Sequence, residues 1–305
     1  MSLGDIDRFD PADVALQFYT SGTTGHPKGV QLTHANIVGP ALHSWCVSCP
    51  SRDQAARPRD CTFAPRRRAL HCSFDPERVV DALEHEHVTA VFMVPAMIQA
   101  IVHGVPDLES RDFSGLRRVS YGAAPISESL LARAIEVFKC GFVQYYGMTE
   151  TCGGALSMTW PDHQSALAGR PELLRSCGRA MAGVGVRIVG VDGAELPRGA
   201  TGEIAIRSRT NMKGYWKLPD ETGRTLRDGW LHTGDAGYMD AEGFVYLRDR
   251  MKDLVITGGE NVYPVEVERV LGGHPSILEV AVIGVPTNSS ARHCWPSRCS
   301  GPVQH

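Results

Sequence analysis

Residues Tyr19 to Val30 read YTSGTTGHPKGV, and they follow directly on the short apolar segment Val14 to Tyr19. The glycines of this stretch allow positive φ angles and bring backbone N–H groups close to an anion. The hydroxyl side chains add short donors, and Lys28 adds a mobile positive charge. The stretch differs from a Walker A motif, because no Gly-Lys-Ser/Thr sequence ends it. We interpret it as a phosphate-binding loop after a buried strand, since lysine and proline are uncommon inside Gly/Ser/Thr linkers.

Up to about Pro171, further apolar segments alternate with helical patterns. Strands are predicted at Val88 to Val94, Arg118 to Tyr121 and Phe142 to Tyr146. Asp75 and Ser127 are predicted N-caps of two helices, and Gly141 is the C-cap signal of the second. Together with Val14 to Tyr19, this order predicts an α/β fold in which a parallel sheet is flanked by helices.

The pattern changes after Pro171. Period-two alternation predicts strands at Val184 to Val189, Gly202 to Arg207 and Phe244 to Leu247, and hence a β-rich subdomain. A strand at Asp253 to Thr257, a helix at Pro264 to Leu271 and a strand at Val280 to Val285 resemble the start of a small α+β domain. We therefore expect a partial large domain at 1–249, the start of a small domain at 250–286, and a tail at 287–305.

Two stretches, 46–72 and 287–305, are poor in aliphatic residues and rich in Arg, Cys, Ser and Pro, and the first shows no helical or strand period. One interpretation is translation in a shifted reading frame; the other is a solvated loop and a disordered tail. A zinc site at Cys46-x-x-Cys49 is a weaker alternative, because the second short-spaced pair of ligands is absent.

Composition excludes several classes of protein. The chain has 305 residues, a formal net charge of -3 and 43% hydrophobic residues. It therefore has enough apolar residues for a core but no basic excess for nucleic-acid binding. The chain has no run of about 18 apolar residues, so no membrane span is predicted. Its polar, acidic N-terminus does not resemble a secretory signal. We expect a cytosolic protein; its oligomeric state is not predicted.

The stretch Tyr19 to Val30 resembles the phosphate loop of the adenylate-forming superfamily, which includes acyl-CoA synthetases, peptide-synthetase adenylation domains and firefly luciferase. Four further segments with the family's motifs follow in the family's order, and the resemblance covers about Pro11 to Ser44 and Ser73 to Pro286. It implies ATP, Mg²⁺ and coenzyme A as cofactor and co-substrates, and a small-molecule carboxylic acid as substrate. The phosphate loop would comprise Thr20, Ser21, Gly22, Thr23, Thr24, Gly25 and Lys28.

The resemblance also implies roles for two strand-end segments. The first resembles the family's adenine-pocket segment and comprises Gly122, Ala123 and Ala124. In the second, which reads YYGMTE from Tyr145 to Glu150, Tyr146 would stack on adenine and Gly147 would lie beside the nucleotide. Thr149 would bond the α-phosphate and Glu150 would hold Mg²⁺, which prefers one or two carboxylates beside phosphate oxygens.

Later segments would complete the site. Trp230 to Asp235 reads WLHTGD, and Asp235 would accept hydrogen bonds from both ribose hydroxyls. Arg250 resembles the arginine that also contacts ribose, and Lys252 occupies the hinge position about which the small domain swings. The coenzyme A tunnel would be lined by Gly258, Gly259 and Glu260.

The sequence departs from the family in three places. Only 18 residues precede Tyr19 where the family has well over a hundred, stretch 46–72 stands where an acyl-site element belongs, and the family's catalytic C-terminal lysine has no counterpart. Loss of one electrostatic donor typically costs on the order of 10²–10³ in rate, and a missing subdomain exposes sheet faces and edges. We therefore expect this chain by itself to be poorly soluble and nearly inactive.

The resemblance implies an ATP-dependent acid–CoA ligase, closest to a fatty acyl-CoA synthetase, that forms acyl-CoA, AMP and diphosphate. One alternative is an adenylation domain that loads a carrier protein, or an aryl-acid ligase. A third possibility is an inactive fragment that binds nucleotide or nothing. Acyl chain length is not predicted.

Overall fold

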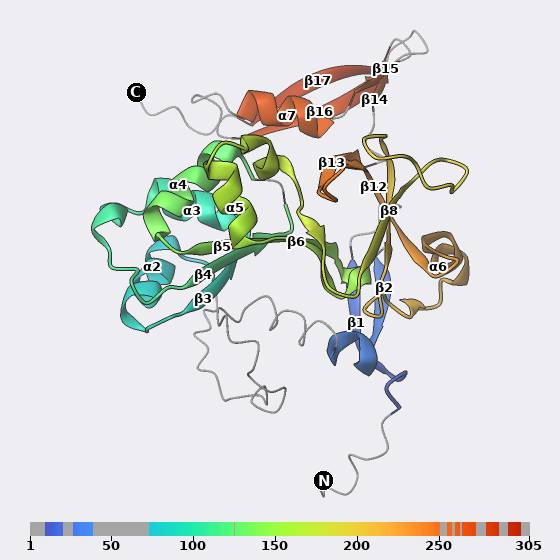
Figure 1. The fold of residues 1–305 in the computed structure, drawn as a ribbon, viewed down its shortest axis with the longest axis horizontal. Coiled ribbons are helices and arrows are strands. Elements are labelled where there is room, and N and C mark those ends of the chain that lie inside the picture. The colour runs from blue at the N-terminus through green and yellow to red at the C-terminus, as the bar shows by residue number, and fades with distance from the viewer. Residues whose placement is uncertain are drawn as a thin grey trace, which may run out of the picture.

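The computed structural model describes residues 10–20, 27–38, 73–124, 126–250, 255–257, 260–262, 264–272, 279–286 and 292–299. The stretch 46–72, with its candidate zinc ligands, lies outside the described residues. Within the described parts, strands and helices form an α/β structure with several sheets (Figure 1). The predicted fold class is therefore confirmed.

A five-stranded mixed sheet is the centre of the helical half, with the strand order β3-β4-β5-β6-β7. Strands β3 (Ala90–Met93), β4 (Arg118–Gly122) and β5 (Gly141–Met148) run parallel. Strand β6 (Gly153–Met158) pairs antiparallel with β5, and β7 (Arg179–Ala180) pairs antiparallel with β6. The predicted parallel sheet is therefore confirmed for three strands, and two antiparallel pairings extend it.

Helices α3, α4 and α5 lie on one face of this sheet (Figure 1). The four helices of this half are α2 (Pro76–His85), α3 (Pro95–Gly104), α4 (Glu128–Phe138) and α5 (Trp160–Leu167). Two short 3-10 helices, η3 (Leu108–Ser110) and η5 (Pro171–Arg175), connect elements. No helix in the described part of the chain combines the length and the apolar character that crossing a membrane requires.

The predicted helix starts are confirmed by their caps. The side chains of Asp75 and Ser127 each accept a hydrogen bond from a first-turn backbone N–H, at 3.1 and 3.3 Å. The predicted end of α4 was wrong by two residues. Lys139 ends the helix with a left-handed φ of 49°, and Gly141 instead opens β5.

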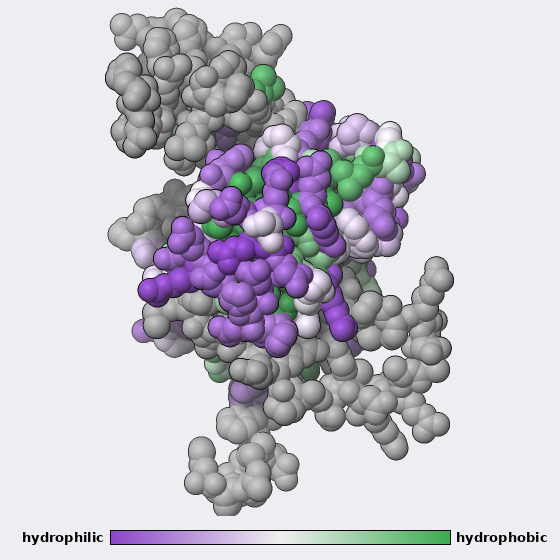
Figure 2. All heavy atoms as spheres, turned by 90° about the vertical axis from the view of Figure 1, so that its left-hand side faces the viewer, coloured by the Kyte–Doolittle hydropathy of each residue, from purple (hydrophilic) through white to green (hydrophobic). Residues whose placement is uncertain are grey.

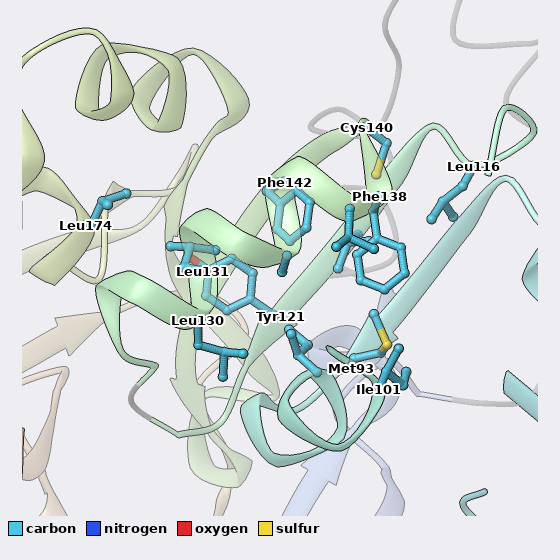
Figure 3. Packing of buried hydrophobic residues seen from close by; sticks show 14 of the residues in the cluster. Met93, Ile101, Leu116, Tyr121, Leu130, Leu131, Phe138, Cys140, Phe142 and Leu174 are labelled. Carbon is cyan, nitrogen blue, oxygen red and sulfur yellow. The ribbon is translucent and has the colours of Figure 1, made fainter. Parts of the chain in front are cut away.

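The main core lies between this sheet and its helices. Tyr121, Phe138 and Phe142 are almost completely buried there, and their rings contact one another at tilted angles (Figure 3). The ring of Phe142 lies 6.2 Å from Tyr121 and 6.5 Å from Phe138, measured between centroids. Such aromatic contacts add to the large apolar area that each ring buries.

A second, three-stranded sheet contains the segment from which the phosphate loop leaves. Strands β1 (Val14–Thr20), β2 (Lys28–Thr33) and β10 (Gly214–Tyr215) pair in that order, all antiparallel. The expectation that Val14 to Tyr19 is a buried strand of the parallel sheet was wrong. Leu16 and Phe18 are 44% and 49% exposed, because β1 is the edge strand of a hairpin with β2.

The predicted β-rich part is confirmed as a third sheet, ordered β11-β12-β9-β8, with β13 paired to β12. Its strands are β8 (Gly185–Val189), β9 (Gly202–Arg207), β11 (Leu226–Arg227), β12 (Trp230–Met239) and β13 (Val245–Arg250). Its own core, which includes Ile204 and Ile206, contacts β6 through Leu156. The short helix α6 (Pro219–Thr225) lies between β10 and β11.

The C-terminal part contains helix α7 (Pro264–Gly272) and two strand pairs. Strand β14 (Val255–Thr257) pairs with β15 (Glu260–Val262), and β16 (Glu279–Pro286) pairs with β17 (Arg292–Cys299). The predicted strand, helix and strand are thus present. The structure differs from the expected irregular tail, because β17 continues an antiparallel ladder with β16 over eight positions.

Candidate functional site

The hairpin β1–β2 holds both ends of the phosphate loop. Thr20 and Lys28 are opposite each other in the register, and the Thr20 hydroxyl donates to the Lys28 carbonyl at 3.5 Å. The loop residues between them, Ser21, Gly22, Thr23, Thr24 and Gly25, lie outside the described residues. Antiparallel pairing therefore explains how the two ends of this segment are brought together.

Lys28 points to a carboxylate that the sequence did not single out. Its ammonium Nζ lies 2.6 Å from Oε2 of Glu221 on α6 and 5.1 Å from the centre of the Tyr215 ring. The Lys28 side chain is only 12% exposed. Its hydrogen bond to Glu221 is the main cause that lowers the pKa of that carboxyl below the usual value.

Glu150 lies in the 3-10 turn η4 (Thr149–Thr151), directly after β5. Its side chain is buried, and the Tyr215 hydroxyl donates a hydrogen bond to Oε1 of Glu150 at 2.8 Å. The backbone carbonyl of Glu150 also accepts from the Met212 N–H at 2.7 Å. Tyr215 therefore contacts both Lys28 and Glu150, which the sequence separates by more than a hundred residues.

Tyr146 and Asp235 form the second link between distant motifs. The Tyr146 hydroxyl on β5 donates to Oδ2 of Asp235 on β12 at 2.6 Å. Burial is the main cause that raises the pKa of Tyr146, and the negative charge of Asp235 adds to it, so the phenol remains a donor. The two side chains that the resemblance assigns to adenine and ribose are thus direct neighbours.

Glu203 supports the turn that carries Asp235, and sequence reasoning missed it. One carboxylate oxygen accepts from the Gly234 N–H at 3.0 Å, and the other lies 2.8 Å from Nδ1 of His232. Gly234 has a φ of 75°, a conformation that glycine adopts without strain. Its position at the start of β9 was the only sequence signal for Glu203.

Gly122, Ala123 and Ala124 follow β4, as the sequence predicted. A Cβ at Gly122 would lie 2.2 Å from the backbone oxygen of Tyr145, so the missing side chain is required by the neighbouring strand β5. Ala123 takes a left-handed φ of 69° and is exposed, as is Ala124. The small residues therefore end the strand with an open backbone turn.

The C-terminal candidates are only partly described. In the β12–β13 register Arg250 is the partner of Asp235, so the two backbones lie side by side. Glu260 opens β15. The hinge candidate Lys252 and the tunnel candidates Gly258 and Gly259 lie outside the described residues.

Two carboxylates and a histidine on α2 do not form a separate metal site. Asp81, Glu84 and His85 offer ligand atoms close to one another. However, Arg111 already pairs with Asp81 at 2.9 Å and with Glu84 at 2.7 Å. The side of the molecule on which α2 and α4 lie is mostly hydrophilic in Figure 2, as expected for a solvated face with ion pairs.

The close contact at Gly147 gives a first prediction. A Cβ there would lie 1.9 Å from the backbone oxygen of Gly153 on β6, so Gly147→Ala is expected to destabilise the chain by about 1–3 kcal/mol. Urea denaturation followed by circular dichroism measures the loss. Gly104→Ala is the matched control, because no atom lies within 4 Å of its added Cβ. Equal midpoints for the two variants would contradict the prediction.

Comparisons with known proteins agree with these motifs. The family described as AMP-binding enzyme matches residues 4–66 and 67–216. A fatty acid–[acyl-carrier-protein] ligase of Streptomyces coeruleorubidus is 38% identical over 90% of this chain and 56% of its own length. A feruloyl-CoA synthase of Amycolatopsis is 40% identical, with 90% and 57% coverage. For the medium/long-chain-fatty-acid–CoA ligase FadD8 of Mycobacterium tuberculosis, identity is 37% and coverage is 90% and 49%.

Solved structures show the same likeness. The amide bond synthetase McbA from Marinactinospora thermotolerans has a TM-score of 0.80 and 32% identity, covering 98% of this chain and 62% of its own. The o-succinylbenzoate CoA synthetase of Bacillus subtilis, in complex with ATP and magnesium, has a TM-score of 0.78 and 29% identity, with 97% and 62% coverage. The chain thus spans about half the length of the curated relatives that it matches. The family match and the shared fold place this chain in the AMP-binding enzyme family.

Proposed function

We propose that this chain is the nucleotide-binding core of an ATP-dependent acid–CoA ligase. The observation that carries the proposal is the contact of Tyr215 with both Lys28 and Glu150, at 5.1 Å from the ring centre and 2.8 Å from the hydroxyl. Through these contacts the positive charge of Lys28 and the carboxylate of Glu150, which belong to two separate motifs, lie near the same side chain. That pairing suits a magnesium-bound polyphosphate, which needs cationic donors and few protein carboxylates.

The proposed reaction has two steps. A carboxylate oxygen of the acid attacks the α-phosphorus of ATP, and the bond from that phosphorus to the bridging oxygen breaks, giving acyl-AMP and diphosphate. The thiol of coenzyme A then loses its proton and attacks the acyl carbon, and AMP leaves. Lys28 and Thr149 are proposed to stabilise phosphate charge, as preorganised donors do in other phosphoryl-transfer sites. Tyr146, Asp235 and Arg250 are proposed to hold the nucleoside.

Magnesium fits the residues that are present. Among the described residues, a hydrogen bond reaches only one oxygen of the Glu150 carboxylate, from Tyr215. We propose the second oxygen as the ligand atom, since magnesium is commonly bound by one or two carboxylates and substrate phosphates. When bound, the ion would neutralise charge on the phosphates.

We propose that residues 1–249 belong to the large domain and residues 250–286 to the start of the small one, with Lys252 as the hinge. Gly258, Gly259 and Glu260 are proposed to line the coenzyme A tunnel after rotation. We also propose a cytosolic location, as expected from the sequence.

Fatty acids are the proposed substrates, and the similarity to FadD8 supports this class. The similarity to a feruloyl-CoA synthase supports an aryl acid as the second candidate. AMP formation by the whole protein, measured with coenzyme A and a panel of fatty and aryl acids, separates the two. An enzyme that loads a carrier protein would instead require that protein, in place of coenzyme A, to supply the thiol.

Nucleotide binding by this chain is the direct test. ATP with Mg²⁺ at about 100 times its dissociation constant is expected to stabilise the fold by about 2.7 kcal/mol. A thermal-shift titration measures this, with GTP as the control nucleotide. Absence of any shift with ATP, with or without Mg²⁺, would refute the proposed function.

A further inference from the structure

Tyr215 occupies a position that none of the family motifs assigned. It lies on β10, where its backbone pairs with Val30 of β2, two residues beyond Lys28. Its backbone N–H donates to the Thr222 hydroxyl on α6 at 2.9 Å. The backbone of Tyr215 is therefore held by contacts with β2 and α6, and its side chain is buried.

The two ends of this side chain have different electrostatic properties. The Lys28 ammonium lies over the negative face of the ring at 5.1 Å from its centre. The hydroxyl donates to Oε1 of Glu150 at 2.8 Å.

The hydrogen bond orients the Glu150 carboxylate. With Oε1 held by Tyr215, rotation of the carboxylate about its last torsion is restricted, and the second oxygen keeps one direction. Partners that orient a metal-binding side chain in this way typically change metal affinity about 10- to 100-fold when they are removed.

We propose that Tyr215 is a positioning residue, whose hydroxyl fixes Glu150 for the magnesium ion of Mg·ATP and whose ring places Lys28 beside the same site. This inference rests on the proposed function, since it assumes that Glu150 binds the ion. On this inference the Tyr215 hydroxyl acts through Glu150 and does not itself bind the ion. Glu221, whose Oε2 lies 2.6 Å from the Lys28 ammonium, also holds this side chain.

The test is the Mg²⁺ dependence of ATP binding by the full chain, measured by isothermal titration in EDTA and at increasing MgCl₂. Tyr215→Phe keeps the ring under Lys28 and removes only the donor to Glu150. We expect it to raise the Mg²⁺ concentration for half-maximal enhancement of ATP binding about tenfold. Metal-free ATP affinity is expected to stay within about twofold, because the ring contact with Lys28 remains.

Tyr246→Phe is the matched control. Tyr246 is also buried, and its hydroxyl also donates to a carboxylate, that of Asp240 at 3.3 Å, outside the candidate site. The Mg²⁺ requirement of this variant should equal that of the wild type. Far-UV circular dichroism and melting curves establish that both variants are folded.

Glu150→Gln and the double variant complete the cycle. Tyr215→Phe should add no further change in the Glu150→Gln background, because the carboxylate that it orients is gone. A Glu150→Gln variant with an unchanged Mg²⁺ requirement would overturn the inference even if Tyr215→Phe folded poorly.

The outcomes separate the two proposals. If the wild type binds no ATP, the proposed function fails and the inference fails with it. If the wild type binds Mg·ATP but Tyr215→Phe behaves as Tyr246→Phe, only the role of Tyr215 is refuted. A raised Mg²⁺ requirement that appears only when Glu150 is present supports the inference.

Discussion

Replacing Asp235 by alanine is expected to weaken ATP binding about 100-fold, because the variant lacks the carboxylate that we propose accepts hydrogen bonds from both ribose hydroxyls. Hydrogen bonds to charged groups each contribute about 1.5–3 kcal/mol, so two of them account for such a loss. In the structure Asp235 already accepts from the Tyr146 hydroxyl at 2.6 Å, which fixes its direction. Isothermal titration of ATP into the wild type and the variant measures the difference.

An ATP analogue that lacks both ribose hydroxyls tests the same hydrogen bonds without relying on one variant. The wild type should bind 2′,3′-dideoxy-ATP as weakly as Asp235→Ala binds ATP, and the variant should not distinguish the two nucleotides. Asp192→Ala is the control, because Asp192 is another turn aspartate, whose side chain accepts only from the nearby Ala194 N–H among the described residues. If Asp235→Ala still preferred ATP over the dideoxy analogue, the ribose assignment would be wrong.

Replacing Phe142 by alanine should cost about 3–5 kcal/mol of stability, the usual range for a fully buried phenylalanine. Phe142 has no exposed surface and contacts Tyr121 and Phe138 in the centre of the main core (Figure 3). The substitution would leave a cavity between β5 and the helices. Since domains are commonly stable by only about 5–15 kcal/mol, much of the variant is expected to unfold at moderate urea concentrations.

Phe92→Ala provides the comparison on β3 of the same sheet. Its side chain is 55% exposed, so the same chemical change is expected to alter stability by less than about 1 kcal/mol. The midpoints of urea denaturation, measured for both variants, test this difference in stability. Similar losses for Phe92→Ala and Phe142→Ala would contradict the location of the core.

Elements with a local signal were predictable from the sequence. Helices α2 and α4 begin where Asp75 and Ser127 predict, because an N-cap depends on neighbouring residues only. The partner of β1 could not be predicted in this way, since pairing with β2 is a tertiary contact. Two adjacent strands in sequence were thus read as one strand and a loop, and the antiparallel hairpin was missed.

The residues of the candidate site also divide into those with a local sequence signal and those that depend on tertiary contacts. Four site residues were predictable because each belongs to a distinctive motif: Lys28, Glu150, Tyr146 and Asp235. In the structure Tyr215 contacts both Lys28 and Glu150, and Tyr146 bonds directly to Asp235. Tyr215, Glu221 and Glu203 were missed. They act through contacts between different sheets and helices, and their own sequence surroundings are those of an ordinary β-rich segment.

The exposed edge strand β1 has a practical consequence for all these measurements. Among the described strands β1 has a partner on one side only, and the backbone groups of its other side, beside half-exposed Leu16 and Phe18, can recruit the same strand of another molecule. Self-association would compete with nucleotide binding and would make apparent affinities depend on protein concentration. Titrations therefore require dilute protein, with light scattering recorded alongside, so that ligand effects are separated from assembly.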